Sequence, residues 1–240
     1  MSVGAGAGAL LLAAALGVAG VGGGPVAGAS ERSSSSSSSQ LAQAKKALLV
    51  RSDFPSGWSA HGSTTTSAGG GTSSFPGGSQ LASCLGVSQS LIDINTPSAN
   101  SPTFETKGGV DTVQDSASVF SSTKQADQEY GAISSPKVPG CMTTVLQGPA
   151  RQEIVNSLGK GITVGTITVA AVPGSALAAH TSGFTMSFPA TDSGVTLHAA
   201  ITFISMMRGT MASQLTIESV GKAFPVSLQR HLVSVAYGRT

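Results

Sequence analysis

A serine and a lysine three residues apart are the first candidates for covalent chemistry. The run Ser121-Ser122-Thr123-Lys124 fits the S-x-x-K pattern of penicillin-binding enzymes. The partner motifs Ser-Asp-Asn and Lys-Thr-Gly do not follow it, and no G-x-S-x-G nucleophile elbow occurs in the sequence. The match therefore indicates a chance arrangement in a serine-rich chain, and a serine hydrolase has no positive support.

Two histidines, His180 and His198, fall on neighbouring predicted strands. His198 has the polar parity of its strand, whereas His180 shares the parity of Phe184 and Met186, so the two imidazoles could approach across a sheet. Two histidines without a carboxylate companion on those strands make a poor metal site. We therefore predict solitary histidines, no bound metal and no cofactor.

Asp115 stands on the apolar parity of a predicted strand, between Val113 and Ala117. If that face is buried, the carboxylate needs a partner or a functional reason, because a lone buried charge is costly. The alternative, which we favour, is that this face opens to solvent at Asp115.

Bulky apolar side chains indicate a third kind of site, a cleft for an apolar ligand. Its candidate lining consists of Phe54, Trp58, Phe184, Met186 and Met207. Methionine adapts to irregular ligands, so methionines beside Arg208 could form a pliable rim. Such residues more often belong to the core, and the pattern alone does not separate the two interpretations.

Charge and composition exclude two classes of protein. A net charge of +2 argues against a nucleic-acid binder that depends on counterion release. The two cysteines are far apart and the four histidines are scattered, which excludes the common zinc patterns.

Hydrophobic periodicity predicts the elements that must position these residues. Helical spacing favours helices over Leu41–Val50, Gln80–Ile94, Thr123–Ser134, Pro139–Gln147 and Pro149–Leu158, and a C-terminal helix around Leu228–Ala236. Alternation predicts strands over Val113–Val119, Ile162–Ala171, Phe184–Phe188, Val195–Phe203 and Met211–Ile217, with a tight turn at Arg208-Gly209. The parity slips within Ile162–Ala171, which indicates a bulge near Gly165 or burial on both faces.

Clean alternation is typical of an antiparallel sheet with one buried face. We therefore predict an α+β fold, with an antiparallel sheet of about four to five strands covered by helices on one face. About 200 residues after the N-terminal segment suffice for one core, so we expect a single domain over residues 41–240.

The N-terminal segment has the pattern of an export signal. Its apolar run, Ala9–Leu16, is followed by Ala27-Gly28-Ala29, a small-x-small site that makes Ser30 the first mature residue. No basic residue precedes the run, so residues 1–29 are interpreted as a signal peptide or a retained membrane anchor. Seven serines, Ser33–Ser39, predict a flexible linker over residues 30–40.

An exported chain with two cysteines is expected to join them as a disulfide, here Cys84–Cys141. The bond would fix the N-terminal helical arm to a later helix. A redox pair is the alternative, but separated cysteines lack the CxxC geometry that lowers a thiol pKa.

Three features together resemble a known family. They are the run Ala47–Trp58, then Val119-Phe120 with Ala126 ahead of Cys141, and the terminal Ala236-Tyr237-Gly238-Arg239. They resemble the exported lipoprotein-like and PknH-type extracytoplasmic sensor-like domains of actinobacteria. The resemblance implies a disulfide-braced antiparallel sheet with helices around a ligand-binding cleft. The chain departs from the kinase-type sensors in having one cysteine pair instead of two.

These observations predict a non-catalytic, extracytoplasmic domain of the cell envelope that binds an apolar ligand in a cleft. Its partner would be a small or lipidic ligand or an envelope protein, with no nucleic acid, and membrane contact only through an uncleaved N-terminal segment. The alternatives are an envelope hydrolase with an unrecognised site and a structural or protein-interaction module.

Overall fold

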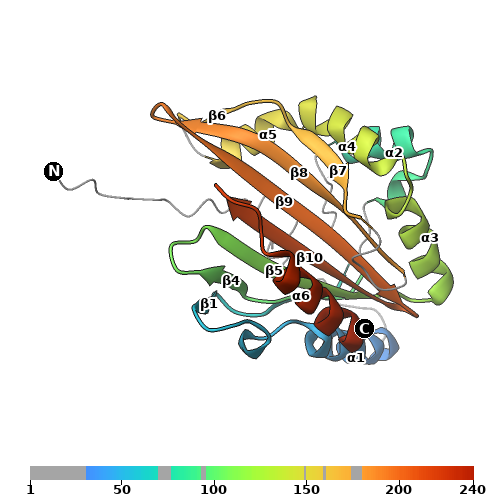
Figure 1. Ribbon diagram of the computed structural model, residues 1–240. Coiled ribbons are helices and arrows are strands. Elements are labelled where there is room, and N and C mark those ends of the chain that lie inside the picture. Colours follow the sequence, from blue (N-terminus) through green and yellow to red (C-terminus); the bar gives the residue numbers. More distant parts are fainter. Residues whose placement is uncertain (1–30, 70–76, 93–95, 149, 159–160, 174–179) are drawn as a thin grey trace.

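The computed structural model describes residues 31–69, 77–92, 96–148, 150–158, 161–173 and 180–240 (Figure 1). Its α-helices are α1 (Glu31–Ala47), α2 (Gly78–Leu85), α3 (Thr123–Ile133), α4 (Val138–Gln147), α5 (Arg151–Leu158) and α6 (Val226–Arg239), with short 3-10 turns η2 (Arg51–Asp53) and η3 (Gln89–Leu91). Its strands are β1 (Trp58–His61), β2 (Thr65–Ser67), β3 (Ser98–Asn100), β4 (Thr103–Thr106), β5 (Asp111–Val119), β6 (Thr163–Val164), β7 (Thr168–Ala171), β8 (Thr181–Asp192), β9 (Val195–Arg208) and β10 (Met211–Val220).

All ten strands of the described residues belong to one antiparallel sheet, which confirms a single α+β domain. The order across it is β1-β4-β5-β10-β9-β8-β6, with β3 also pairing β5 and β7 also pairing β8. The prediction of four to five strands accounts for the long central strands, but the sheet has more strands than that. The strands missed, β1 to β4, have only three or four residues each and are too short to show alternation.

Tight turns fix the register of the three longest strands. Arg208 pairs with Met211, so the tight β9–β10 turn consists of Gly209 and Thr210, one position later than the predicted Arg208-Gly209. Asp192 pairs with Val195 in the same way. The two residues of that β8–β9 turn, Ser193 and Gly194, both have positive φ, the geometry of a type I′ hairpin.

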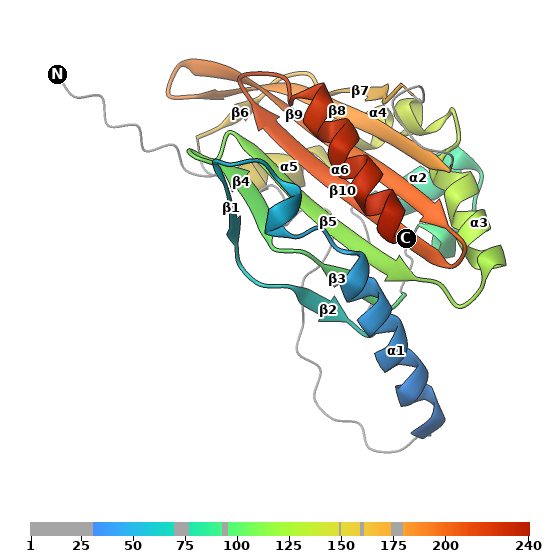
Figure 2. The same ribbon diagram turned by 60° about the horizontal axis from the view of Figure 1, so that its bottom comes forward.

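Helices cover both faces of the sheet, so the expectation of helices on one face is wrong. Figure 2 shows α6 in front of the strands and α2, α4 and α5 behind them. The strand β9 explains the difference, because it buries both parities: Phe203 packs with α4 and α5, and its neighbour Ile204 packs with α6. Its regular alternation is limited to the first half of the strand.

The parity slip around Gly165 corresponds to a break between two short strands, β6 and β7, that both pair with β8. The N–H of Gly165 donates to the carbonyl of Pro189 at 2.8 Å. A Cβ at Gly165 would lie 2.5 Å from Pro189 Cγ, so only glycine fits this approach.

The disulfide Cys84–Cys141 joins α2 to α4, which confirms the predicted pairing. The two Cα atoms lie 5.7 Å apart. Around the bond, Leu81 and Leu85 of α2 pack with Val145 of α4 in one core cluster. The bond therefore fastens α2 to the helical layer behind the sheet.

The first helix starts earlier than Leu41, the position expected from the sequence. α1 includes the serine run interpreted as a linker, and Figure 2 shows its first turns extending beyond the sheet. Its last turn is held by Ala44 and Ala47, which are buried against Ala99 and Ala117. Residues 1–29, interpreted as a signal peptide or anchor, lie outside the described residues. Among the described helices, none combines the length and apolar character needed to cross a membrane.

Candidate functional site

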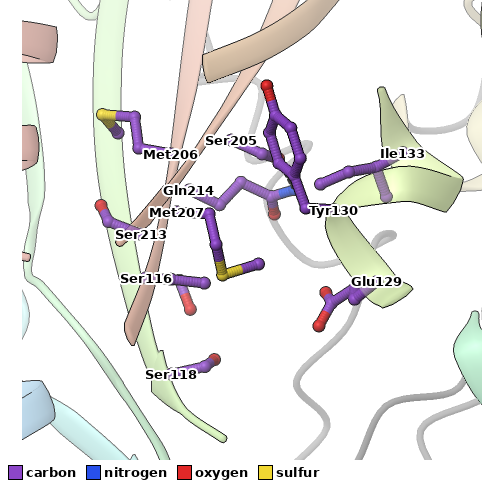
Figure 3. A pocket seen from close by; sticks show the side chains of 11 residues that line it. Ser116, Ser118, Glu129, Tyr130, Ile133, Ser205, Met206, Met207, Ser213 and Gln214 are labelled. Carbon is purple, nitrogen blue, oxygen red and sulfur yellow. Dashed lines mark hydrogen bonds between the residues drawn. The ribbon is translucent and has the colours of Figure 1, made fainter. Parts of the chain in front are cut away.

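A cavity of about 120 Å³ lies between α3 and the sheet (Figure 3). Its floor is a patch of two rows across three adjacent strands. Ser118, Ala212 and Met207 form one row, and Ser116, Gln214 and Ser205 form the next. Because these residues alternate with core positions of β5, β10 and β9, they all point to the α3 side of the sheet.

The helix α3 supplies the other wall. Ser122 caps it by accepting a hydrogen bond from the Gln125 N–H, at 3.2 Å. Ala126 is fully buried and packs against Phe120 and Met207. One turn later, Glu129, Tyr130 and Ile133 border the cavity. The predicted helical stripe Ala126, Tyr130 and Ile133 is therefore the face that meets the sheet, and Glu129 lies beside it.

Glu129 is the one charged residue that lines the cavity, within the part of the chain that the structure describes. Figure 3 shows its carboxylate directed from α3 toward the strands that carry Ser116 and Met207. The Oε2 atom is buried and has no hydrogen-bond partner among the described residues. Burial raises the pKa of Glu129 to about 8, because desolvation disfavours the charged carboxylate.

The Tyr130 ring, which lines the cavity, is in contact with a histidine ring outside it. The Tyr130 ring meets the His180 ring edge-on, with centroids 5.7 Å apart. His180 itself is exposed and has a φ of 55°, a left-handed conformation at the turn into β8. His180 thus contacts a lining residue without lining the cavity.

Behind the cavity floor, Asp115 is completely buried, so the favoured interpretation of an open face at this residue is wrong. The carboxylate accepts hydrogen bonds from the Leu49 N–H at 2.9 Å and from Ser213 Oγ at 2.7 Å. Burial raises its pKa to about 6, and the two hydrogen bonds oppose that shift. Asp115 thereby ties the end of α1 to the middle of the sheet.

The end of the chain reinforces this junction. Arg239 forms a bidentate pair with Asp53, at 2.7 and 2.8 Å, and its Nη1 also donates to the Leu48 carbonyl at 2.8 Å. Fork geometry of this kind is among the stronger ion-pair arrangements. Residues 48–53 are therefore held from the sheet by Asp115 and from α6 by Arg239.

The five residues of the expected apolar cleft are divided between the two faces of the sheet. Phe54 and Trp58 pack with Phe104 on the α6 side, where the Phe54 and Phe104 rings stack at 4.4 Å. Phe184 and Met186 pack on the other side, in the cluster that contains α4. Met207 alone among the five lines the cavity described above.

The S-x-x-K run is the start of α3. Its Ser122 is the helix cap, and Ser121 Oγ donates to Gln125 Oε1 at 2.7 Å. These contacts give the run a structural role.

The two histidines occupy opposite ends of the β8–β9 pair, since His198 is opposite Pro189 whereas the His180 carbonyl accepts from the Met207 N–H. The described residues contain no grouping of side chains able to hold a metal ion.

A serine, a histidine and a carboxylate do meet on β1 and β4. His61 Nε2 lies 3.2 Å from Ser59 Oγ and 3.1 Å from Glu105 Oε1. A catalytic triad requires the acid and the serine on different ring nitrogens, whereas here both contact Nε2. This exposed cluster therefore lacks the geometry of a nucleophile with its base.

The polar cavity was missed in the sequence for a specific reason. Ser116, Ser118 and Gln214 have the polar parity of their strands, which is ordinarily the solvent-facing parity. The sequence contained one signal of this site: Glu129 stands beside Tyr130 on a predicted helix that has to pack on the sheet. The site can bind a small polar group through hydroxyl, amide and carboxyl groups.

Comparisons with known proteins concern the fold alone. No protein-family model matches the sequence, and no curated protein sequence matches it significantly. Solved structures do match, among them the extracellular domain of PknH from Mycobacterium tuberculosis. The match covers 83% of this chain and 95% of that one, with 9% sequence identity and a TM-score of 0.44. PknH is also the kinase that gives its name to the sensor-like domains named in the sequence analysis.

Proposed function

We propose that this chain is a non-catalytic, extracytoplasmic ligand-binding domain of the cell envelope, and that its binding site is the cavity under α3. One observation carries the proposal. The buried Oε2 of Glu129 has no hydrogen-bond partner among the described residues, inside a cavity that the rest of the lining leaves uncharged. Buried polar atoms are normally paired, and a bound molecule would supply this partner.

Export is supported by two independent features. The N-terminal run has the length and the small-x-small site of a signal segment. The disulfide between α2 and α4 is of the kind that persists in oxidising compartments. Both features are consistent with a domain that functions outside the cytoplasm.

A binding role accounts for the site better than hydrolysis does. Within the described residues, the cavity lining contains serines and a glutamate but no histidine. Ser213 is already committed to Asp115, and the Ser205 hydroxyl accepts from Gln214 Nε2 at 3.4 Å. The lining, as far as the structure describes it, therefore lacks the serine–histidine arrangement of a serine hydrolase.

The test compares the exported protein with two variants of the same strand. Ser116→Phe would fill the cavity, whereas Gln114→Phe, at the next position on the same face of β5, lies outside its lining. Residues 30–240 of each protein are expressed with export into an oxidising compartment of the host and then purified. They are examined by native mass spectrometry, and small molecules are extracted from them. We expect a molecule to co-purify with the wild type and Gln114→Phe but not with Ser116→Phe. Identical ligand-free spectra from all three would count against a binding site here.

A protein-interaction role is the second candidate, favoured by one surface. Four exposed apolar residues, Val110, Val195, Leu197 and Val226, lie at one end of the sheet. They are brought together because the Val220 N–H donates to the Val110 carbonyl and the Gly221 N–H donates to the His198 carbonyl. Loss of an envelope protein from a pull-down with Leu197→Ser, but not with Ser116→Phe, would support this role over ligand binding.

A further inference from the structure

We infer that the cavity recognises a primary amine or another small organic ammonium group, held by the Glu129 carboxylate. The inference rests on the proposed function, because it assigns a ligand class to that same site. It follows from three properties of the lining: its charge, the placement of its acceptors and its apolar surfaces.

Charge excludes one class of ligand. Besides Glu129, the lining residues are neutral: Ser116, Ser118, Tyr130, Ile133, Ser205, Met206, Met207, Ala212, Ser213 and Gln214. A phosphate or carboxylate ligand would find no cation here and would face the Glu129 carboxyl. A cation, in contrast, gains both an ion pair and a charge-assisted hydrogen bond with the Glu129 carboxylate, whose Oε2 is buried.

The placement of acceptors fits an ammonium group, which has three N–H donors to satisfy. Glu129 lies on the α3 wall, and the hydroxyls of Ser116 and Ser118 lie on the floor provided by β5 (Figure 3). A donor group between wall and floor can therefore be bonded from both sides. A neutral hydroxyl has a single donor and leaves most of these acceptors unused.

Apolar surfaces accommodate the carbon atoms next to the nitrogen. Ile133 comes from α3, and the thioether of Met207 extends from β9 into the cavity (Figure 3). Tyr130 adds a further lining side chain from the same helix. A volume of about 120 Å³ limits the recognised group to an amine with a short chain.

Binding should release a proton, which gives the inference a distinctive signature. Burial raises the pKa of Glu129 to about 8, so the carboxyl of the empty cavity is mainly protonated at neutral pH. Pairing with R–NH₃⁺ requires the carboxylate, so the carboxyl proton passes to solvent as the complex forms. The apparent affinity for an amine should therefore rise between about pH 6 and pH 8.

Few other ionisable groups face Glu129. On α3 the neighbour is Tyr130, whose pKa burial raises, and beyond it lies His180, in edge contact with the Tyr130 ring. The lining residues of β5, β9 and β10 are all uncharged.

Ethanolamine is the probe, with ethylene glycol as its neutral counterpart and glycolate as its anionic one. Each is titrated into the ¹⁵N-labelled mature protein while amide shifts are followed by NMR. We expect saturable shifts with ethanolamine at α3, β5, β9 and β10, and little response to the other two compounds. Calorimetry in two buffers of different ionisation enthalpy counts the released proton.

Two isosteric variants test whether ethanolamine binding depends on Glu129 in particular or on any buried glutamate. Glu129→Gln keeps the shape of the side chain and should weaken ethanolamine binding about tenfold or more. Glu218→Gln is the matched control, because burial also raises the pKa of Glu218, to about 7, at a position of β10 outside the lining. It should bind ethanolamine as the wild type does.

The inference is overturned if ethanolamine shifts no cavity residue, if ethylene glycol binds equally well, or if Glu129→Gln binds the amine unchanged. These failures are distinct from failure of the binding site itself. A neutral molecule that co-purifies with the wild type, and not with Ser116→Phe, would retain the site and refute the ligand class.

Discussion

At the scale of single residues, Asp115 is a carboxyl group that the sheet buries completely. It is completely buried, and desolvation raises its pKa to about 6 although Ser213 and Leu49 donate hydrogen bonds to it. A carboxyl with a raised folded-state pKa stabilises the fold most when it is protonated. Its contribution is therefore present below the unfolded-state pKa of about 3.9 and is lost as the pH rises through about 6.

The variant Asp115→Asn should show this linkage. Relative to the wild type, it should gain stability as the pH rises from about 4 to 7, by on the order of 2 kcal/mol. Urea unfolding at both pH values measures the difference. Asp127→Asn, an exposed position on α3, is the control. If wild type and Asp115→Asn have parallel pH profiles, the desolvation of Asp115 has no thermodynamic consequence.

Two glycines test how closely the backbones approach. A Cβ at Gly183 would lie 2.5 Å from the Phe203 carbonyl of the paired strand, whereas a Cβ at Gly131 in α3 would meet nothing within 4 Å. We expect Gly183→Ala to destabilise the protein by about 1–3 kcal/mol through overpacking. Gly131→Ala should stabilise it by about 0.5–1 kcal/mol through helix propensity. Thermal melts of both variants would reveal any reversal of this order.

At the scale of elements, the disulfide fastens α2 to α4 across 57 residues of sequence. Replacing both cysteines with serine should lower the free energy of unfolding by about 4 kcal/mol, the loop-closure value for a span of this length. Denaturant unfolding of the oxidised wild type and the double serine variant measures the loss. A difference near zero would mean that α2 is held by its packing against Leu146 and its neighbours instead.

The C-terminal helix is fastened to the α1 junction by one side chain. Arg239→Ala removes the bidentate pair with Asp53 and the bond to the Leu48 carbonyl. With the arginine about one-third exposed, we expect a loss of about 1–2 kcal/mol. Arg230→Ala, on the exposed side of the same helix, should change stability little. Equal effects of the two variants would show that the fork adds nothing beyond helix packing.

The elements also show what a sequence can and cannot predict. Alternation identified β5, β8, β9 and β10, because long strands repeat their pattern several times. The strands β1 to β4 escaped because three or four residues cannot establish a period. The cavity was not predicted because Ser116 and Gln214 have a polar parity that is ordinarily exposed. Only the packing of α3 over these residues makes that surface the floor of a cavity. Asp115 was recognised as anomalous, but its donors come from Leu49 and Ser213, far away in sequence.

At the scale of the whole molecule, the sheet is shared by two large core clusters, one on each face. Since β9 contributes side chains to both clusters, unfolding of one cluster would also disrupt the packing of the other. We expect a single cooperative unfolding transition. The only tryptophan, Trp58, reports on the α6 side, and far-ultraviolet circular dichroism reports on all elements. Coincident denaturation curves from the two probes are expected, whereas separated curves would show that the faces unfold independently.

The fork between Arg239 and Asp53 has a practical consequence for handling the protein. Because Arg239 also reaches the Leu48 carbonyl, the C-terminal end of α6 lies beside the residues that follow α1. A surface or a reporter attached after Thr240 would therefore sit beside this junction. The turn at Ser193-Gly194 lies at the other end of the long strands. Immobilisation through Thr240 would therefore leave that hairpin free to meet a partner in solution.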